Sequence, residues 1–211
     1  MEYNWYHYTS VNTLYNILKS NEFWWGNASA MNDKAELTDF INKLYDAVTE
    51  TVPSSKQNEV EALFSGVNNR LQNEYPYLMS LSALRDDAAQ WERYADNAKG
   101  VCISFNTSIL QEVLLPNSVF FNEVFYSYDV TKHAYYRILT HYFETGELSE
   151  GFNSIYGLID NLLVGAVCYK HESFAAEAET RLAALPYYTE HLDRYHSRIE
   201  FECIGGKIKK C

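Results

Sequence analysis

Residues 5–10 have the sequence Trp5-Tyr6-His7-Tyr8-Thr9-Ser10, which places three aromatic rings, an imidazole and two hydroxyl groups in six consecutive positions. Bulky side chains of this kind favour a strand, and we expect one over residues 3–8. Ser10 is then suited to cap a helix whose Leu14, Ile17 and Leu18 share one face. A core strand does not need a histidine flanked by hydroxyl groups, so the end of this strand is predicted to line a cleft. The alternative is a tyrosine-rich strand whose histidine is satisfied by a neighbouring carbonyl group.

The rest of the chain predicts long helices interleaved with short strands that do not follow one another regularly. Helices are expected over residues 32–48, over a third segment ending near residue 73, and over 86–94, 129–145 and 151–168. Strands are expected over residues 23–26, 78–84, 100–105 (buried), 119–126, 182–185 and 199–204, with Gly205-Gly206 turning into residues 207–210. This order predicts an α+β fold with short mixed or antiparallel strands, in a single domain over residues 1–211.

The composition indicates a globular protein without a basic surface for nucleic acid. Hydrophobic residues make up 47% of the 211 residues and aromatic residues 16%, with 18 tyrosines. So many rings can stack on planar ligands, or can simply build the core and its rim. The net charge is −11 and the 17 lysines and arginines form no basic tract, so binding to duplex DNA is not expected.

The cysteines and the N-terminal sequence favour a reducing compartment. Cys102, Cys168, Cys203 and Cys211 lie far apart, with neither a Cys-x-x-Cys pair nor the spacing of a zinc site. The N-terminus lacks the pattern of a signal peptide, and the most apolar stretch, residues 158–169, is short and contains Asp160 and Asn161. We therefore expect a cytoplasmic protein that does not enter a membrane, while its oligomeric state is not predictable from the sequence.

A second polar segment, residues 86–102, combines acids with aromatic residues. On a helix, Asp87, Trp91 and Tyr94 lie at positions i, i+4 and i+7 and share one face. This arrangement favours a face that lines the cleft, with Arg85, Arg93 or Arg181 as the partner of Asp87. The alternative is that Asp87 caps the helix while Trp91 and Tyr94 pack into the core.

A third segment, residues 170–182, contains two glutamates and an arginine in alternation. If residues 177–182 are extended, Glu177, Glu179 and Arg181 fall on one face. Two carboxylates at that distance raise the pKa of one member or recruit a cation, and either arrangement is typical of a functional site. The alternative is an exposed helix end with a structural Glu/Arg pair.

Several short motifs follow one another from residue 3 to about residue 209. They are Tyr6-His7-Tyr8-Thr9-Ser10 with Leu14 and Ile17-Leu18, Asn32-Asp33 with Glu36, Trp91 with Tyr94, Lys99-Gly100-Val101-Cys102, and Lys170-His171 with Glu177-x-Glu179-x-Arg181. In this order they resemble a large bacterial family, domain-of-unknown-function family 2971, whose members are often described as His-Tyr-Thr-Ser proteins. Residues 205–209 resemble the closing strand of that family. The resemblance implies one domain of this family and does not by itself imply an activity.

The histidine-tyrosine strand and the late Glu-x-Glu also resemble, more distantly, the ADP-ribosyltransferase superfamily. That resemblance implies a split sheet surrounded by helices and NAD as a substrate. It implies that His7 orients NAD, that Tyr8 or a nearby tyrosine stacks on nicotinamide, and that Glu179 is the catalytic carboxylate, with Glu177 acting toward the acceptor. The acceptor would be a protein or a nucleic acid. The further ligand-binding residues implied are Thr9, Ser10, Trp91, Tyr94 and Arg181.

The resemblance extends to a role as a bacterial toxin or phage-defence effector, and two other functions stay open. One is a non-catalytic module that binds a nucleotide or a protein partner in the same cleft. The other is a metal-dependent phosphodiester hydrolase with Asp86, Asp87, Glu177 and Glu179 as hard ligands, although no recognised metal-ligand spacing is present. The chain has no Gly-x-Gly-x-x-Gly and no Walker loop, so any nucleotide must be held without a glycine phosphate cradle.

Overall fold

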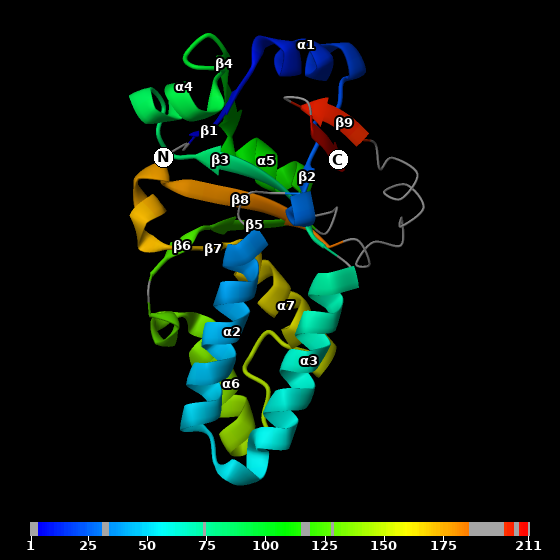
Figure 1. Ribbon diagram of the computed structural model, residues 1–211, viewed down its shortest axis with the longest axis vertical. Coiled ribbons are helices and arrows are strands. Elements are labelled where there is room, and N and C mark those ends of the chain that lie inside the picture. The colour runs from blue at the N-terminus through cyan, green and yellow to red at the C-terminus, as the bar shows by residue number, and fades with distance from the viewer. Residues whose placement is uncertain are drawn as a thin grey trace.

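A computed structural model describes residues 4–30, 34–73, 75–114, 119–127, 129–185, 201–204 and 207–210. It has a sheet half and a helical half (Figure 1). The Asn32-Asp33 pair and the expected turn at Gly205-Gly206 lie outside the described residues.

An antiparallel sheet forms one half of the molecule (Figure 1). Its strands are β1 (Asn4–Thr9), β2 (Gly26–Asn27), β3 (Tyr77–Ser82), β4 (Val101–Asn106), β5 (Val119–Glu123) and β8 (Glu179–Ala184). Their order is β4-β1-β3-β8-β5, with β2 beside β3. The strands β6 (Phe125–Tyr126) and β7 (Tyr169–Lys170) form a separate parallel pair, and β9 (Phe201–Ile204) and β10 (Lys207–Lys210) form a hairpin. The α+β class and the short, mainly antiparallel strands are confirmed.

The sheet is split between β1 and β3. Strand β1 pairs with β4 over six residue pairs and β3 pairs with β8 over six, whereas β1 and β3 meet at the single pair Tyr6–Ser82. The His7 Nδ1 atom lies 3.0 Å from the Ser80 carbonyl oxygen and bridges the same two strands. A side chain thus substitutes for part of a backbone ladder, which leaves room for a cavity between the two strands.

Four long helices form the other half (Figure 1). They are α2 (Lys34–Thr51), α3 (Gln57–Asn73), α6 (Ala134–Thr145) and α7 (Ile155–Val167). On α2 the apolar residues Leu37, Phe40, Ile41 and Leu44 recur at helical spacing and are buried, as expected. Helix α7 is buried along most of its length and packs against α2, α3 and β8, so it joins the two halves.

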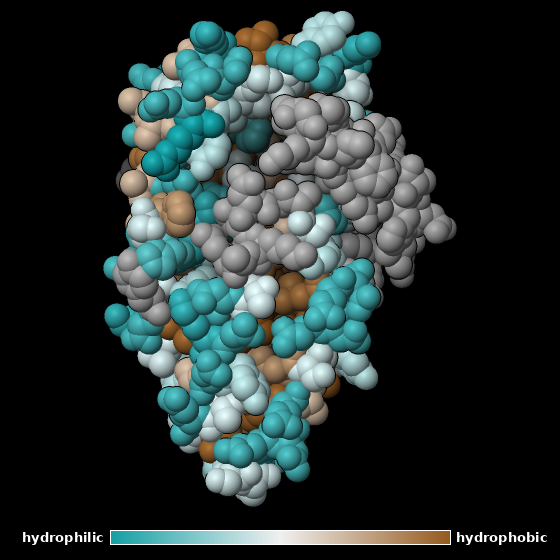
Figure 2. Space-filling view, in the orientation of Figure 1, coloured by the Kyte–Doolittle hydropathy of each residue, from teal (hydrophilic) through white to brown (hydrophobic). Residues whose placement is uncertain are grey.

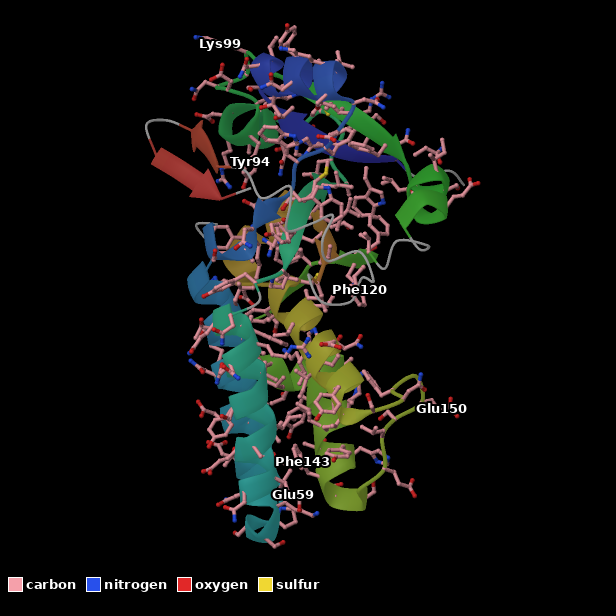
Figure 3. The ribbon with its side chains drawn as sticks, turned by 90° about the vertical axis from the view of Figure 1, so that its right-hand side faces the viewer. Glu59, Tyr94, Lys99, Phe120, Phe143 and Glu150 are labelled. Atoms are coloured by element: carbon pink, nitrogen blue, oxygen red, sulfur yellow. The ribbon has the colours of Figure 1, made fainter. Side chains whose placement is uncertain are left out.

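The surface of the helical half follows from this packing. Phe143 lies inside it, whereas Glu59 and Glu150 lie on its outside (Figure 3). Figure 2 shows hydrophilic side chains over the helices with apolar residues visible between them. Among the described residues, no helix has the length and apolar character needed to cross a membrane.

Shorter helices complete the fold. They are α1 (Val11–Ser20), α4 (Ala88–Tyr94) and α5 (Thr107–Leu114), with the 3-10 turns η1 (Ala28–Ala30), η2 (Ser54–Lys56), η4 (Val130–Lys132) and η5 (Glu172–Glu177). Ser10 caps α1 as expected, because its Oγ accepts the Thr13 N–H at 3.0 Å.

Some predicted boundaries were wrong for local reasons. The strand expected over residues 23–26 begins only at Gly26, and the strand expected to be buried at 100–105 is β4, a partly exposed edge strand. The segment 119–126 divides into β5 and β6 around Val124. Helix α6 begins after His133, which caps it, and α7 begins after its cap Ser154, so both start later than expected.

The turn between α4 and β4 has an unusual backbone. Asp96, Asn97 and Ala98 all have positive φ angles, of 50°, 54° and 63°. Gly100 follows at a point where a Cβ atom would lie 2.2 Å from the Thr9 carbonyl oxygen and 2.8 Å from the Ala95 carbonyl group. The glycine is therefore required by the close approach of two backbone segments rather than by its own φ.

Gly100→Ala is expected to lower the free energy of unfolding by about 3 kcal/mol, because rigid backbone must move to admit one methyl group. The matched control is Gly66→Ala in α3, where the new Cβ would be 3.5 Å from Ile159 Cδ1. That control should raise stability by up to about 1 kcal/mol through helix propensity. Denaturant unfolding measures both, and equal effects of the two substitutions would contradict the close approach at Gly100.

Candidate functional site

A cavity of about 140 Å³ lies at the split in the sheet. Tyr6, His7 and Tyr8 border it from β1, and Ser80, Leu81 and Ser82 border it from β3. Gln90 and Tyr94 reach it from α4, in the sheet half of the molecule (Figure 3). Its remaining lining is the charged cluster, which we define as Lys170, Glu177, Glu179 and Arg181. The structure thus brings His7 and Glu179 to one cavity although 172 positions separate them (179 − 7).

The charged cluster is buried and internally paired. Each of its four residues is 7% exposed or less. The Arg181 Nε and Nη2 atoms lie 2.7 and 3.2 Å from the two carboxylate oxygens of Glu179. The Lys170 Nζ atom lies 2.7 Å from Glu177 Oε2 and 3.0 Å from Glu179 Oε2. Two cations and two anions balance, which offsets much of the cost of removing these charges from water.

This pairing keeps Glu179 and Lys170 ionised. Burial acts to raise the pKa of Glu179, but the Arg181 guanidinium and the Lys170 ammonium outweigh it and hold that pKa below its ordinary value. Burial likewise acts to lower the pKa of Lys170, and the Glu179 and Glu177 carboxylates outweigh it and raise that pKa. At neutral pH the cavity therefore presents a fixed carboxylate at Glu179 and a fixed ammonium group at Lys170.

Glu177 reaches the cluster from a turn rather than from a strand. It ends η5, and Ala178, with a φ of 43°, precedes the first residue of β8, Glu179. The extended conformation considered for residues 177–182 therefore holds only from Glu179 onward, although all three charged side chains still border one cavity. Ser82 Oγ and Gln90 Nε2 donate to the Glu177 main-chain carbonyl at 2.8 and 3.3 Å, and these bonds hold the turn in place.

The Glu177 carboxylate also has a partner at the cavity's outer side. Tyr94 is 45% exposed. Its hydroxyl group donates a hydrogen bond to Glu177 Oε1 at 2.8 Å. Arg93 Nη1 lies 3.4 Å from the same oxygen. Burial, followed by the bond to Glu177, raises the pKa of Tyr94 to about 12, so the hydroxyl stays protonated and donates.

His7 has a defined tautomer. Its Nδ1 atom donates to the Ser80 carbonyl oxygen, which accepts only, so the neutral ring carries its proton there and Nε2 is left as an acceptor. Burial lowers the pKa of His7, against a smaller opposing effect of the Ser80 bond, and favours this neutral form. The neighbouring carbonyl that a structural histidine would use is therefore present, and the ring still borders the cavity.

Only part of the second predicted segment, residues 86–102, lines the cavity, and Trp91 instead packs against a cavity residue. The Tyr8 hydroxyl donates to the Leu84 carbonyl at 2.7 Å, and the Tyr8 ring meets the Trp91 ring edge-on, with centroids 5.2 Å apart. Trp91 Nε1 donates to Asp86 at 2.7 Å. Trp91 thus packs against Tyr8 and is not among the residues that line the cavity.

Asp87 is the N-cap of α4. It accepts the Gln90 N–H at 2.9 Å instead of pairing with Arg85, Arg93 or Arg181, so the expected arginine partner was wrong and the capping alternative holds for this residue. The same alternative placed Trp91 and Tyr94 in the core, and for Tyr94 this is wrong because that residue is exposed.

Thr9 and Ser10 do not line the cavity either. Thr9 is buried near the end of β1, and Ser10 is occupied by its capping bond to α1. In the described part of the chain, no three His, Cys, Asp or Glu side chains are close enough together to hold a metal ion. Asp86 and Asp87 are engaged at the start of α4, away from Glu177 and Glu179.

Sequence reasoning missed the role of several cavity residues, three of which contact Glu177. These three are Lys170, Gln90 and Ser82. Lys170 carried a usable signal, because it directly follows the apolar stretch 158–169 and a lysine there must find a buried partner. Gln90 and Ser82 carried none, since their bonds to the Glu177 carbonyl depend on the tertiary fold.

Comparison with known proteins gives one family match. Residues 90–182 match DUF2971, a family described as protein of unknown function. The match supports the family resemblance drawn from the motifs, and it includes most of α4 and the whole charged cluster but not β1. No curated protein and no solved structure matches the chain.

Glu179→Gln is expected to destabilise the protein by about 3–5 kcal/mol, because it leaves two buried cations facing one carboxylate. Adding Lys170→Met should recover part of the loss, since the cluster is then balanced again. The control is Glu172→Gln on the exposed side of η5, which should change stability by less than about 0.5 kcal/mol. Denaturant unfolding at pH 7 measures all three, and a neutral Glu179→Gln would contradict the pairing.

Proposed function

We propose that this protein is an NAD-using, ADP-ribosyltransferase-like enzyme whose cavity binds the nicotinamide end of NAD. The observation that carries the proposal is the convergence of His7, Tyr8, Glu177 and Glu179 on one cavity. These side chains come from opposite ends of the chain, and nothing in a purely structural role requires them to share one cavity.

The chemistry suits the charges of the site. Breaking the bond between nicotinamide and ribose sends the bonding electron pair to nicotinamide and leaves positive charge on the ribose. A carboxylate held ionised and oriented, as Glu179 is by Arg181 and Lys170, stabilises that charge without having to reorganise. The acceptor nucleophile then bonds to the ribose carbon and loses its proton, for which the Glu177 carboxylate is the nearby base in this proposal.

The size and polarity of the cavity limit which part of NAD enters. About 140 Å³ is smaller than the roughly 300–1,000 Å³ of typical ligand pockets, so the cavity suits one ring and its sugar rather than a whole dinucleotide. The neutral His7 ring offers an acceptor at Nε2, and Tyr6, Tyr8 and Tyr94 offer aromatic surface. In this proposal the adenosine and pyrophosphate remain outside the cavity. A role as a toxin or phage-defence effector rests on the resemblance to the ADP-ribosyltransferase superfamily alone.

Two double variants test which carboxylate reacts. Glu179→Gln/Lys170→Met and Glu177→Gln/Lys170→Met each remove one anion and one cation, so they carry the same net charge and differ in which glutamate remains. We expect the first to lose at least about 100-fold in nicotinamide release from NAD and the second to retain measurable release. Release is followed by chromatography, with folding checked by circular dichroism. The opposite ranking would assign the reaction to Glu177, and no release by the unmodified protein across several candidate acceptors would refute the enzyme.

A non-catalytic nucleotide-binding module is the second candidate, favoured by one observation. Both carboxylate oxygens of Glu179 are already paired with Arg181 or Lys170, so the group is held as a structural ion as well as a reactive one. Such a module would show a rise in melting temperature with NAD and no turnover. The metal-dependent hydrolase would instead be stabilised by Mg²⁺ or Mn²⁺ without NAD, so thermal-shift measurements separate it from the two NAD-binding functions. Turnover of NAD then separates the enzyme from the binding module.

A further inference from the structure

Lys170 joins parts of the site that no other described side chain joins. It belongs to β7, a two-residue strand paired with β6, outside the main sheet. Its Nζ atom contacts Glu177 at the end of η5 and Glu179 at the start of β8. One ammonium group therefore lies between both members of the Glu-x-Glu pair, while its own side chain is only 6% exposed.

The carboxylates depend on Lys170 to different degrees. Glu179 has a second cation, since Arg181 approaches both of its oxygens. Glu177 has Arg93 at 3.4 Å, but the Arg93 side chain is 59% exposed and therefore weakly effective through solvent screening. Lys170 is thus the buried cation of Glu177 and the shared cation of the pair.

We infer that Lys170 is a positioning residue, whose ammonium group holds the Glu177 and Glu179 carboxylates in one arrangement in the cavity. Without it, two buried carboxylates share Arg181 as their buried cation, and like charges at this distance favour proton uptake by one of them. That proton would remove a charge and turn an acceptor oxygen into a donor. The role in catalysis rests on the proposed function, whereas the effect on the carboxylates does not.

The groups that face Lys170 come from every element around it. They are Glu177 on η5, Glu179 and Arg181 on β8, Tyr94 and Arg93 on α4 through Glu177, Tyr126 on β6, and the Phe174 ring, whose centroid is 5.4 Å from Nζ. His7 borders the same cavity from β1. Of these, the two glutamates are the groups whose protonation should respond to loss of the ammonium charge between pH 5 and 8.

The sign of the pH dependence distinguishes this role from packing. In the unmodified protein the pKa of Glu179 is lowered, so its contribution to stability is present above its unfolded pKa of about 4.3 and is lost only as the pH falls below it. In Lys170→Met, one carboxyl group has a raised pKa in the folded state, by about 1–3 units. The folded state then binds the extra proton, so the variant regains stability as the pH falls from 8 to 5.

Denaturant unfolding of Lys170→Met at several pH values tests the inference without any ligand. The quantity compared is the difference in unfolding midpoint from the unmodified protein, because the buried His133, whose pKa is lowered and which does not line the cavity, affects both proteins alike. We expect that difference to shrink toward pH 5. Lys170→Arg should show no such trend, and Glu177→Gln/Lys170→Met should abolish it by restoring the balance of charge. A deficit that is the same at every pH would overturn the inference.

Nicotinamide release gives the second measurement. In Lys170→Met, the acid limb of the pH profile should move upward by about 1–3 units, while Lys170→Arg restores the original limb. The surface variant Lys132→Met, whose side chain is 71% exposed, is the control and should leave the profile unchanged. An unshifted limb would overturn the positioning role. If the unmodified protein released no nicotinamide, the proposed function would fail, and the unfolding series would still decide the role of Lys170.

Discussion

The buried charged cluster is the interaction on which the arrangement of the sheet half depends. Lys170, Glu177, Glu179 and Arg181 come from β7, η5 and β8, and their ion pairs join these elements. Arg181 also donates to the Val167 carbonyl at the end of α7, so the same cluster connects the sheet to the helical half. Its four charges tolerate burial only while each has its partner, because an uncompensated buried charge costs several kcal/mol. These ion pairs therefore hold the charged cluster in place at the cavity.

The split between β1 and β3 supplies the space of the cavity beside the charged cluster. A fully paired ladder would place the two strands about 4.8 Å apart along their whole length and leave no space for a ligand. Here Tyr6–Ser82 is their single register pair, and His7 adds a side-chain bond to Ser80. Strand β1 is held by its other neighbour, β4, with which it pairs over six positions. Because β1 is paired with β4 and β3 is paired with β8, each over six positions, the gap between β1 and β3 can persist without destabilising either strand.

Local patterns predicted much of the fold, and the failures have physical causes. The apolar spacing of α2 and the cap at Ser10 are encoded within one or two helical turns, so both could be read from the sequence. His7, Tyr8 and the Glu-x-Glu segment were also found, because polar side chains among aromatic ones are uncommon. The turn at Glu177 and the roles of Ser82 and Gln90 could not be predicted, since the bonds that fix them join residues 95 and 87 positions apart.

A balanced cluster also limits how the site can select a ligand. The charges of its two cations and two anions cancel, and the whole chain carries a net charge of −11. The charged cluster therefore offers no net attraction to a phosphate group. What it offers is a fixed arrangement of opposite charges in a place that water does not reach freely, and such an arrangement acts on charge that develops after binding. Recognition of the neutral part of a ligand then falls to the rings of Tyr6, Tyr8 and Tyr94 and to His7 Nε2. Under the proposed function, the exposed Arg93 beside Glu177 is a cation outside the cluster that is left for an anionic part of the ligand.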